Sequence, residues 1–115
     1  MKLTDHFTVE EFQCKCCHKI DMDADFVTRI EAFRVEWGKP MKVLSGFRCP
    51  KHNAEVGGTR KSQHPCGKAG DFEVMPSDRY AFIALAIKHK FRGIGVAKDF
   101  IHLDTRSDPP AVWKY

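Results

Sequence analysis

Two histidines and one aspartate offer the donor atoms that a divalent metal ion needs. His64 and Asp71 stand at the two ends of one polar stretch, and His102 lies in a later apolar segment. Two imidazoles and a carboxylate form a ligand set that suits zinc, and a catalytic zinc ion keeps its fourth position open to water. From spacing alone, two interpretations stay open: a zinc site, or ordinary hydrogen-bonded histidines beside a capping aspartate.

A loop would have to carry His64 and short β-strands Asp71 and His102, because proline and glycine between His64 and Asp71 argue against a helix there. The sequence instead predicts a loop over residues 59–70, and such loops commonly hold binding residues. Four strands are predicted: residues 41–44 from a short apolar-rich run, residues 71–75 from alternation, and residues 93–96 and 100–104 as a hairpin around a short turn. If the strands that contain Asp71 and His102 are adjacent, both side chains can project from one face of the sheet.

Two main helices are expected to cover this sheet. The first is predicted over residues 23–37, where apolar residues recur on one face and Gly38 provides a C-terminal stop. The second is predicted from Ser77, as its cap, to about residue 89. We therefore expect an α+β fold in a single domain, residues 1–115, with two main helices packed on a small antiparallel sheet.

The cysteines allow several roles. There are five of them, and an odd number excludes complete disulfide pairing within one chain. A C-x-x-C-H pattern ends at His18, but haem attachment requires export and is disfavoured. Small packing residues, one disulfide bridge, or a structural zinc built from Cys14 and Cys17 with partners among His18, Cys49 and Cys66 all stay open.

Several separated motifs extend over nearly the whole chain. They are SGFRCPKHN at residues 45–53, VGG at 56–58, SQH at 62–64, GKA at 67–69 followed by Asp71, GIGV at 93–96 and FIHLD at 100–104. Together they resemble the zinc D-alanyl-D-alanine carboxypeptidase family, in its short single-domain branch that includes phage endolysins. Its fold is related to Hedgehog and to the vancomycin-resistance dipeptidases. The resemblance implies a zinc metallopeptidase that hydrolyses peptidoglycan stem peptides next to D-amino acids, as a carboxypeptidase or an L-alanyl-D-glutamate endopeptidase.

Metal and proton-transfer roles follow from the resemblance. His64, Asp71 and His102 would be the ligands of one catalytic zinc ion, which activates a water molecule as the nucleophile. Asp99, three residues before His102, matches the family's general base and is favoured for that role. Asp104 is the competitor, either as the base or as a partner that orients a ligating histidine.

Substrate contacts are implied for three further residues. Arg48 would recognise a substrate carboxylate or orient the carbonyl, unless it forms a structural salt bridge. Ser62 and Gln63 would hydrogen-bond the peptide, with loop packing as the other interpretation. The partner would then be a peptidoglycan peptide. The alternative function is a non-catalytic zinc-binding or cell-wall-binding module on the same fold.

Composition argues against other classes. The net charge of +4 is too small to imply nucleic acid, and few aromatic residues lie among the basic side chains of residues 39–70. No apolar run reaches the roughly 18 residues that a membrane span needs. The amino end lacks the apolar stretch of a secretory signal. We therefore expect a monomer that stays in the cytoplasm until it is released, encoded by a phage or prophage.

Overall fold

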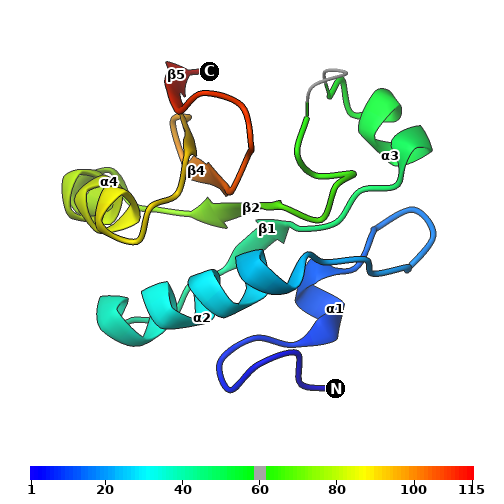
Figure 1. Cartoon of the computed structure of the whole chain (residues 1–115), viewed down its shortest axis with the longest axis horizontal. Coiled ribbons are helices and arrows are strands. Elements are labelled where there is room, and N and C mark those ends of the chain that lie inside the picture. The colour runs from blue at the N-terminus through cyan, green and yellow to red at the C-terminus, as the bar shows by residue number, and fades with distance from the viewer. Residues whose placement is uncertain (59–61) are drawn as a thin grey trace.

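A five-stranded sheet forms the centre of the structure, a computed structural model that describes residues 1–58 and 62–115 (Figure 1). Its strands are β1 (Val43–Ser45), β2 (Ala69–Glu73), β3 (Gly93–Val96), β4 (Phe100–Asp104) and β5 (Ala111–Lys114). They lie in the order β1-β2-β4-β3-β5. Neighbouring strands are antiparallel except β3 and β5, which are parallel. The α+β class is confirmed, and the unpredicted strand β5 makes the sheet mixed rather than wholly antiparallel.

Helices pack around this sheet. They are α1 (Val9–Phe12), α2 (Ala24–Trp37), α3 (Pro50–Glu55) and α4 (Arg79–Lys88), with a 3₁₀ turn, η1 (Pro76–Asp78), before α4. In Figure 1, α1 and α2 lie below β1 and β2, and α3 lies above them. The longest helix, α2, has 14 residues, and no helix in the described part of the chain is long and apolar enough to cross a membrane.

The two main helices begin differently. The Asp23 side chain accepts a hydrogen bond from the Phe26 N–H at the start of α2, and Gly38 ends this helix in the left-handed conformation, with φ 71°. The prediction that Ser77 caps α4 is wrong, because Ser77 lies inside η1 and no side chain caps α4. The 3₁₀ turn starts at Pro76, and it leads directly into α4 without a side-chain cap.

The register between β2 and β4 gives the sheet one polar and one apolar face at its centre. Asp71 lies directly opposite His102. Because successive side chains of a strand point to opposite faces, Phe72, Ile101 and Leu103 point the other way, and all three are fully buried. The polar face is therefore available for a site, while the apolar face packs on the helices.

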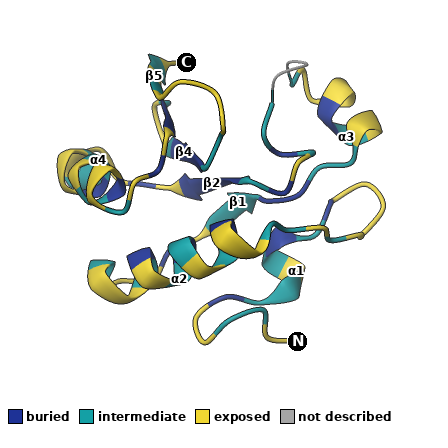
Figure 2. Ribbon diagram, viewed as in Figure 1, coloured by how far each residue is buried: buried dark blue, intermediate teal, exposed yellow. Residues whose placement is uncertain are grey.

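Phenylalanine rings fill much of the core beneath the apolar face. They meet mainly edge to face in a chain of contacts among Phe7, Phe12, Phe26, Phe33, Phe72, Phe82 and Phe91. Figure 2 shows the same distribution, with buried residues along β2 and β4 and exposed residues on the outer sides of the helices. This packed core holds the central strands, and hence the residues on the polar face, in fixed positions.

Candidate metal centre

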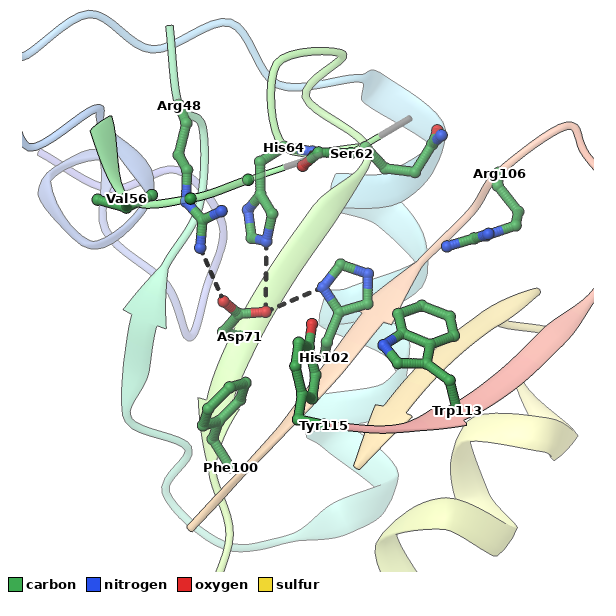
Figure 3. A pocket seen from close by; sticks show the side chains of 13 residues that line it. Arg48, Val56, Ser62, His64, Asp71, Phe100, His102, Arg106, Trp113 and Tyr115 are labelled. Carbon is green, nitrogen blue, oxygen red and sulfur yellow. Dashed lines mark hydrogen bonds and ion pairs between the residues drawn. The ribbon is translucent and has the colours of Figure 1, made fainter. Parts of the chain in front are cut away.

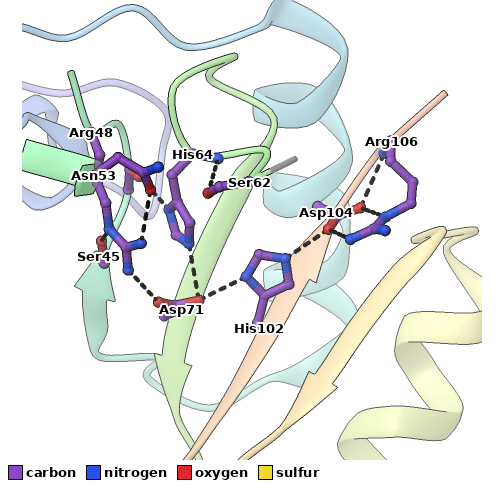
Figure 4. A network of polar contacts seen from close by, with 10 residues as sticks. Ser45, Arg48, Asn53, Ser62, His64, Asp71, His102, Asp104 and Arg106 are labelled. Atoms are coloured by element: carbon purple, nitrogen blue, oxygen red, sulfur yellow. Dashed lines mark hydrogen bonds and ion pairs between the residues drawn. The ribbon is translucent and has the colours of Figure 1, made fainter. Parts of the chain in front are cut away.

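His64, Asp71 and His102 converge on the polar face of the sheet (Figures 3 and 4). One ligand atom from each lies within 4.8 Å of the others. The three residues are only 3%, 6% and 4% exposed, respectively. The Asp71 Oδ1 atom is 3.3 Å from His64 Nε2 and 3.0 Å from His102 Nδ1. Residues far apart in the sequence therefore place three donor atoms around one small volume.

Two strands and one turn position these side chains. Asp71 and His102 face each other across β2 and β4. His64 lies in the turn before β2, where its carbonyl accepts hydrogen bonds from the N–H groups of Gly67 (3.1 Å) and Arg48 (3.4 Å). The first three residues of the loop predicted over 59–70 lie outside the described part of the chain, and β2 begins two residues earlier than expected.

The second nitrogen of each imidazole is already engaged. His64 Nδ1 donates to the Gly46 carbonyl at 2.7 Å, and His102 Nε2 donates to the Asp104 carboxylate at 2.7 Å. A carbonyl and a carboxylate can only accept, so a neutral ring has its lone pair on the nitrogen that faces Asp71. A cation between these lone pairs and Asp71 satisfies all three groups. The donor set, with each histidine oriented by its outer hydrogen bond, therefore fits zinc.

The electrostatics of the cluster favour a cation. Burial is the largest single influence on the Asp71 carboxyl and raises its pKa, but the hydrogen bonds and charges of His102 and His64 together outweigh it, and the pKa lies well below its ordinary value. Burial opposes ionisation of Asp104 too, yet hydrogen bonds with His102 and Arg106 lower its pKa to about 2. Burial lowers the pKa of His102, but hydrogen bonds to Asp104 and Asp71 raise it above the ordinary value. Both carboxylates are thus ionised at neutral pH.

Arg48 holds the other oxygen of Asp71. Its Nη2 atom donates to Asp71 Oδ2 at 3.2 Å, its Nε to Ser45 Oγ at 3.1 Å and its Nη1 to Asn53 Oδ1 at 3.4 Å (Figure 4). The structural salt bridge considered from the sequence is therefore present. Arg48 also lines the pocket in front of the cluster, so the ion pair is compatible with contact to a substrate.

Asp104 contacts the side of His102 that faces away from Asp71, and Arg106 covers it. The residue is 0% exposed. Its Oδ1 accepts from the Arg106 N–H (3.1 Å) and Nε (2.9 Å), and its Oδ2 accepts from Arg106 Nη2 and His102 Nε2, both at 2.7 Å. With both oxygens engaged and away from the pocket, Asp104 is placed to orient His102.

Asp99 is not brought to this cluster. It is exposed in the turn between β3 and β4, and its carbonyl accepts from the Val74 N–H at 3.1 Å. Asp99 is absent from the described residues that line the pocket.

The pocket beside the cluster has a volume of about 430 Å³ (Figure 3). Ser62 and Gln63, the residues expected to contact the peptide, line it. The Ser62 hydroxyl accepts from the His64 N–H at 3.3 Å, and the Gln63 carbonyl accepts from the backbone of Cys66 (3.2 Å) and Lys68 (3.1 Å). Both residues therefore also stabilise the turn that contains His64.

The sequence analysis did not predict seven of the described lining residues as site residues: Val56, Gly57, Gly58, Phe100, Arg106, Trp113 and Tyr115. The Trp113 ring lies 5.2 Å from the His102 ring, and the Arg106 guanidinium lies 4.8 Å from the centre of the Trp113 ring. Alternation along β4 puts residues 102 and 104 on one face, and its continuation could have identified Arg106. Trp113 had no such signal, because β5 was not predicted.

Comparison with known proteins adds a family assignment to this geometry. The family model described as Peptidase M15 matches residues 5–104. This range includes the three converging side chains, Arg48 and Asp104. No curated protein matches the sequence.

Proposed function

Because the chain belongs to the peptidase M15 family and is therefore a zinc metallopeptidase, we propose that it hydrolyses peptidoglycan stem peptides next to D-amino acids. His64, Asp71 and His102 are the proposed zinc ligands. One observation supports this assignment above all: three buried donor atoms meet at the wall of an open pocket, with their outer hydrogen bonds already made. The motifs that resemble D-alanyl-D-alanine carboxypeptidases support the choice of substrate.

Residues of the protein would bind the metal ion and keep its ligands oriented. Zinc, when bound, polarises the scissile carbonyl and makes water available as a nucleophile at neutral pH. Asp71 contributes the negative charge, and Arg48 keeps its second oxygen turned away from the cluster. Asp104, held by Arg106, keeps the His102 ring in the tautomer whose Nδ1 lone pair points to the cluster. We assign Asp104 this positioning role in place of the proton transfer considered from the sequence.

Cationic and aromatic side chains would recognise the peptide. A guanidinium has five N–H donors, and Arg48 uses three of them on Ser45, Asn53 and Asp71 within the described structure. We assign its remaining donors to a carboxylate of the stem peptide. The rings of Phe100, Trp113 and Tyr115 would form an apolar surface that contacts the rest of the stem peptide.

Digestion of purified peptidoglycan by the zinc-loaded protein tests the proposal. We expect mass spectrometry to detect shortened stem peptides. Loss of a terminal D-alanine would identify a carboxypeptidase, and cleavage between L-alanine and D-glutamate an endopeptidase. The His64→Ala variant should release neither product. If the wild-type protein sediments with peptidoglycan but leaves every peptide intact, it is the non-catalytic module instead.

A further inference from the structure

A second group of metal-binding side chains lies outside the candidate metal centre. The sulfur atoms of Cys14, Cys17 and Cys49 lie within 4.8 Å of one another. Cys14 is buried and Cys49 is partly buried. Cys16 is exposed in the same turn and lies near Cys49, although it is outside this 4.8 Å group. We refer to Cys14, Cys16, Cys17 and Cys49 as the cysteine cluster.

A tight turn brings three of these thiols together. The Cys14 N–H donates to the Lys19 carbonyl at 2.7 Å, and the His18 N–H donates to the Cys14 carbonyl at 2.8 Å. His18 completes the turn in the left-handed region, with φ 61°. The chain between Cys14 and Lys19 therefore folds back on itself, and the thiols of Cys14 and Cys17 point to the same place.

Backbone N–H groups are directed at the sulfur atoms. The Cys49 N–H donates to Cys14 Sγ at 3.5 Å, and the His52 N–H donates to Cys49 Sγ at 3.4 Å. Donors in this arrangement compensate the negative charge of thiolates, which is the form of cysteine that binds metal ions.

We propose that the cysteine cluster binds a structural zinc ion, separate from the candidate metal centre, with Cys14, Cys17 and Cys49 as ligands and Cys16 as the fourth. Structural zinc sites are closed, tetrahedral and rich in cysteine, and a C-x-x-C pair such as Cys14 and Cys17 is their usual first half. A three- or four-thiolate site selects zinc over magnesium or calcium, which prefer oxygen ligands.

This ion would crosslink the amino-terminal segment to the segment at one side of the pocket. Cys49 directly follows Arg48 and caps α3, which contains Asn53. The turn from Cys14 follows α1, whose last residue, Phe12, accepts a hydrogen bond from the Phe47 N–H at 2.8 Å. The site would thus join two segments that are far apart in the sequence, one of which positions Arg48.

Metal counting tests the proposal without reference to peptidase activity. Protein purified under reducing conditions should contain about two zinc ions per chain by elemental analysis. Cys17→Ser and His64→Ala should each reduce the content to about one, because each removes a ligand from a different site. Cys66→Ser is the matched control, since Cys66 is exposed and outside the cluster, and it should retain both ions.

Cobalt substitution identifies the ligands directly. Cobalt(II) bound by thiolates shows sulfur-to-metal charge-transfer absorption, which a histidine and carboxylate site lacks. The band should be present in the wild-type protein and in His64→Ala, and absent from Cys17→Ser. Because the wild-type spectrum alone decides whether thiolates bind the metal, the test holds even if Cys17→Ser does not fold.

Two results would overturn the proposal. One is a wild-type protein with a single zinc ion and no thiolate charge-transfer band. The other is an intact mass, measured on the protein as purified, that is lower by two hydrogen atoms with a disulfide mapped within the cluster. Neither result affects the peptidase proposal, which depends on the zinc that His64→Ala removes.

Discussion

At the scale of single residues, the outer partners of the two histidines determine what the cluster can bind. Gly46 and Asp104 accept hydrogen bonds from the outer ring nitrogens of His64 and His102, so the other nitrogen of each ring faces Asp71. When both rings are neutral, these nitrogens carry lone pairs beside a carboxylate oxygen, an arrangement that a bound cation satisfies. The outer hydrogen bonds therefore determine which nitrogen of each ring is available to a metal ion.

The carboxylates Asp104 and Asp99 form a matched pair for testing the positioning role. Asp104→Asn should weaken zinc binding and lower kcat by about 10- to 100-fold, because the His102 ring loses its anionic partner. Asp99→Asn should change neither by more than about twofold, since surface substitutions away from a site have small effects. Chelator competition measures the zinc affinity of each variant, and peptide kinetics measure its kcat. A drop of about a hundredfold in kcat with zinc retained in Asp99→Asn would return the general-base role to Asp99.

The raised pKa of His102 predicts how zinc binding depends on pH. In the metal-free protein, hydrogen bonds to Asp104 and Asp71 stabilise protonated His102 despite its burial. Zinc requires the neutral ring, so a proton must leave before the metal binds. Zinc affinity should therefore begin to fall, as the pH decreases, above the ordinary histidine pKa of about 6.5.

Zinc titrations against a competing chelator, repeated from about pH 8 to about pH 5, measure this dependence. The His89→Gln variant is the control, because His89 pairs with Glu36 away from the cluster and its loss should leave the curve unchanged. A wild-type affinity that stays constant down to the ordinary histidine pKa would contradict the prediction.

At the scale of elements, β5 completes the pocket because β3 has glycine where the two strands approach. Gly95 pairs with His102 on one side and with Trp113 on the other. A Cβ atom at Gly95 would lie 2.7 Å from the Trp113 indole and 2.7 Å from the Tyr115 ring. The absence of a side chain at this position therefore lets the aromatic residues of β5 lie beside the cluster.

Gly95→Ala should displace these rings. We expect a loss of about 1–3 kcal/mol in the free energy of unfolding, as for other overpacked sites. KM for a stem peptide should rise more than kcat falls, because the apolar surface binds substrate and the metal ligands remain. Denaturant unfolding and peptide kinetics measure the two effects. If the clash acts through Trp113, then adding Trp113→Ala should give less than additive destabilisation, and full additivity would rule that cause out.

The elements also differ in how well sequence patterns predicted them. The helix over residues 23–37, the hairpin around residues 97–99 and the strand that contains His102 were predictable, because each combines periodicity with a clear stop signal. β5 was not, because two prolines precede four residues whose pairing partner, β3, is distant in the sequence. In α4 the buried residues are Phe82 and Ala86, and local periodicity does not single them out.

At the scale of the whole molecule, bound zinc should stabilise the fold. Asp71 and His102 come from two strands and His64 from the turn before β2, so an ion held by all three exists only in the folded state. At free zinc about 100 times above its Kd, the free energy of unfolding should rise by about 2.7 kcal/mol for one site. Thermal unfolding with and without a chelator measures the effect.

The His64→Ala variant separates the sources of this stabilisation. In this variant, zinc should raise the free energy of unfolding only by the amount that the cysteine cluster supplies. The further increase seen in the wild-type protein measures the contribution of the candidate metal centre. Identical melting curves for the wild-type protein with zinc and with chelator would show that neither site stabilises the folded chain.

By itself, the sequence identified three candidate metal ligands and indicated that two of them, Asp71 and His102, could share one face of the sheet. His64, Asp71 and His102 were predictable because residue chemistry and strand alternation are local properties. Only the tertiary structure decided the partners: it buried Asp104 under Arg106, left Asp99 exposed and placed Trp113 beside His102. These outcomes depend on packing between distant segments, and alternation within one strand carries no information about distances to another.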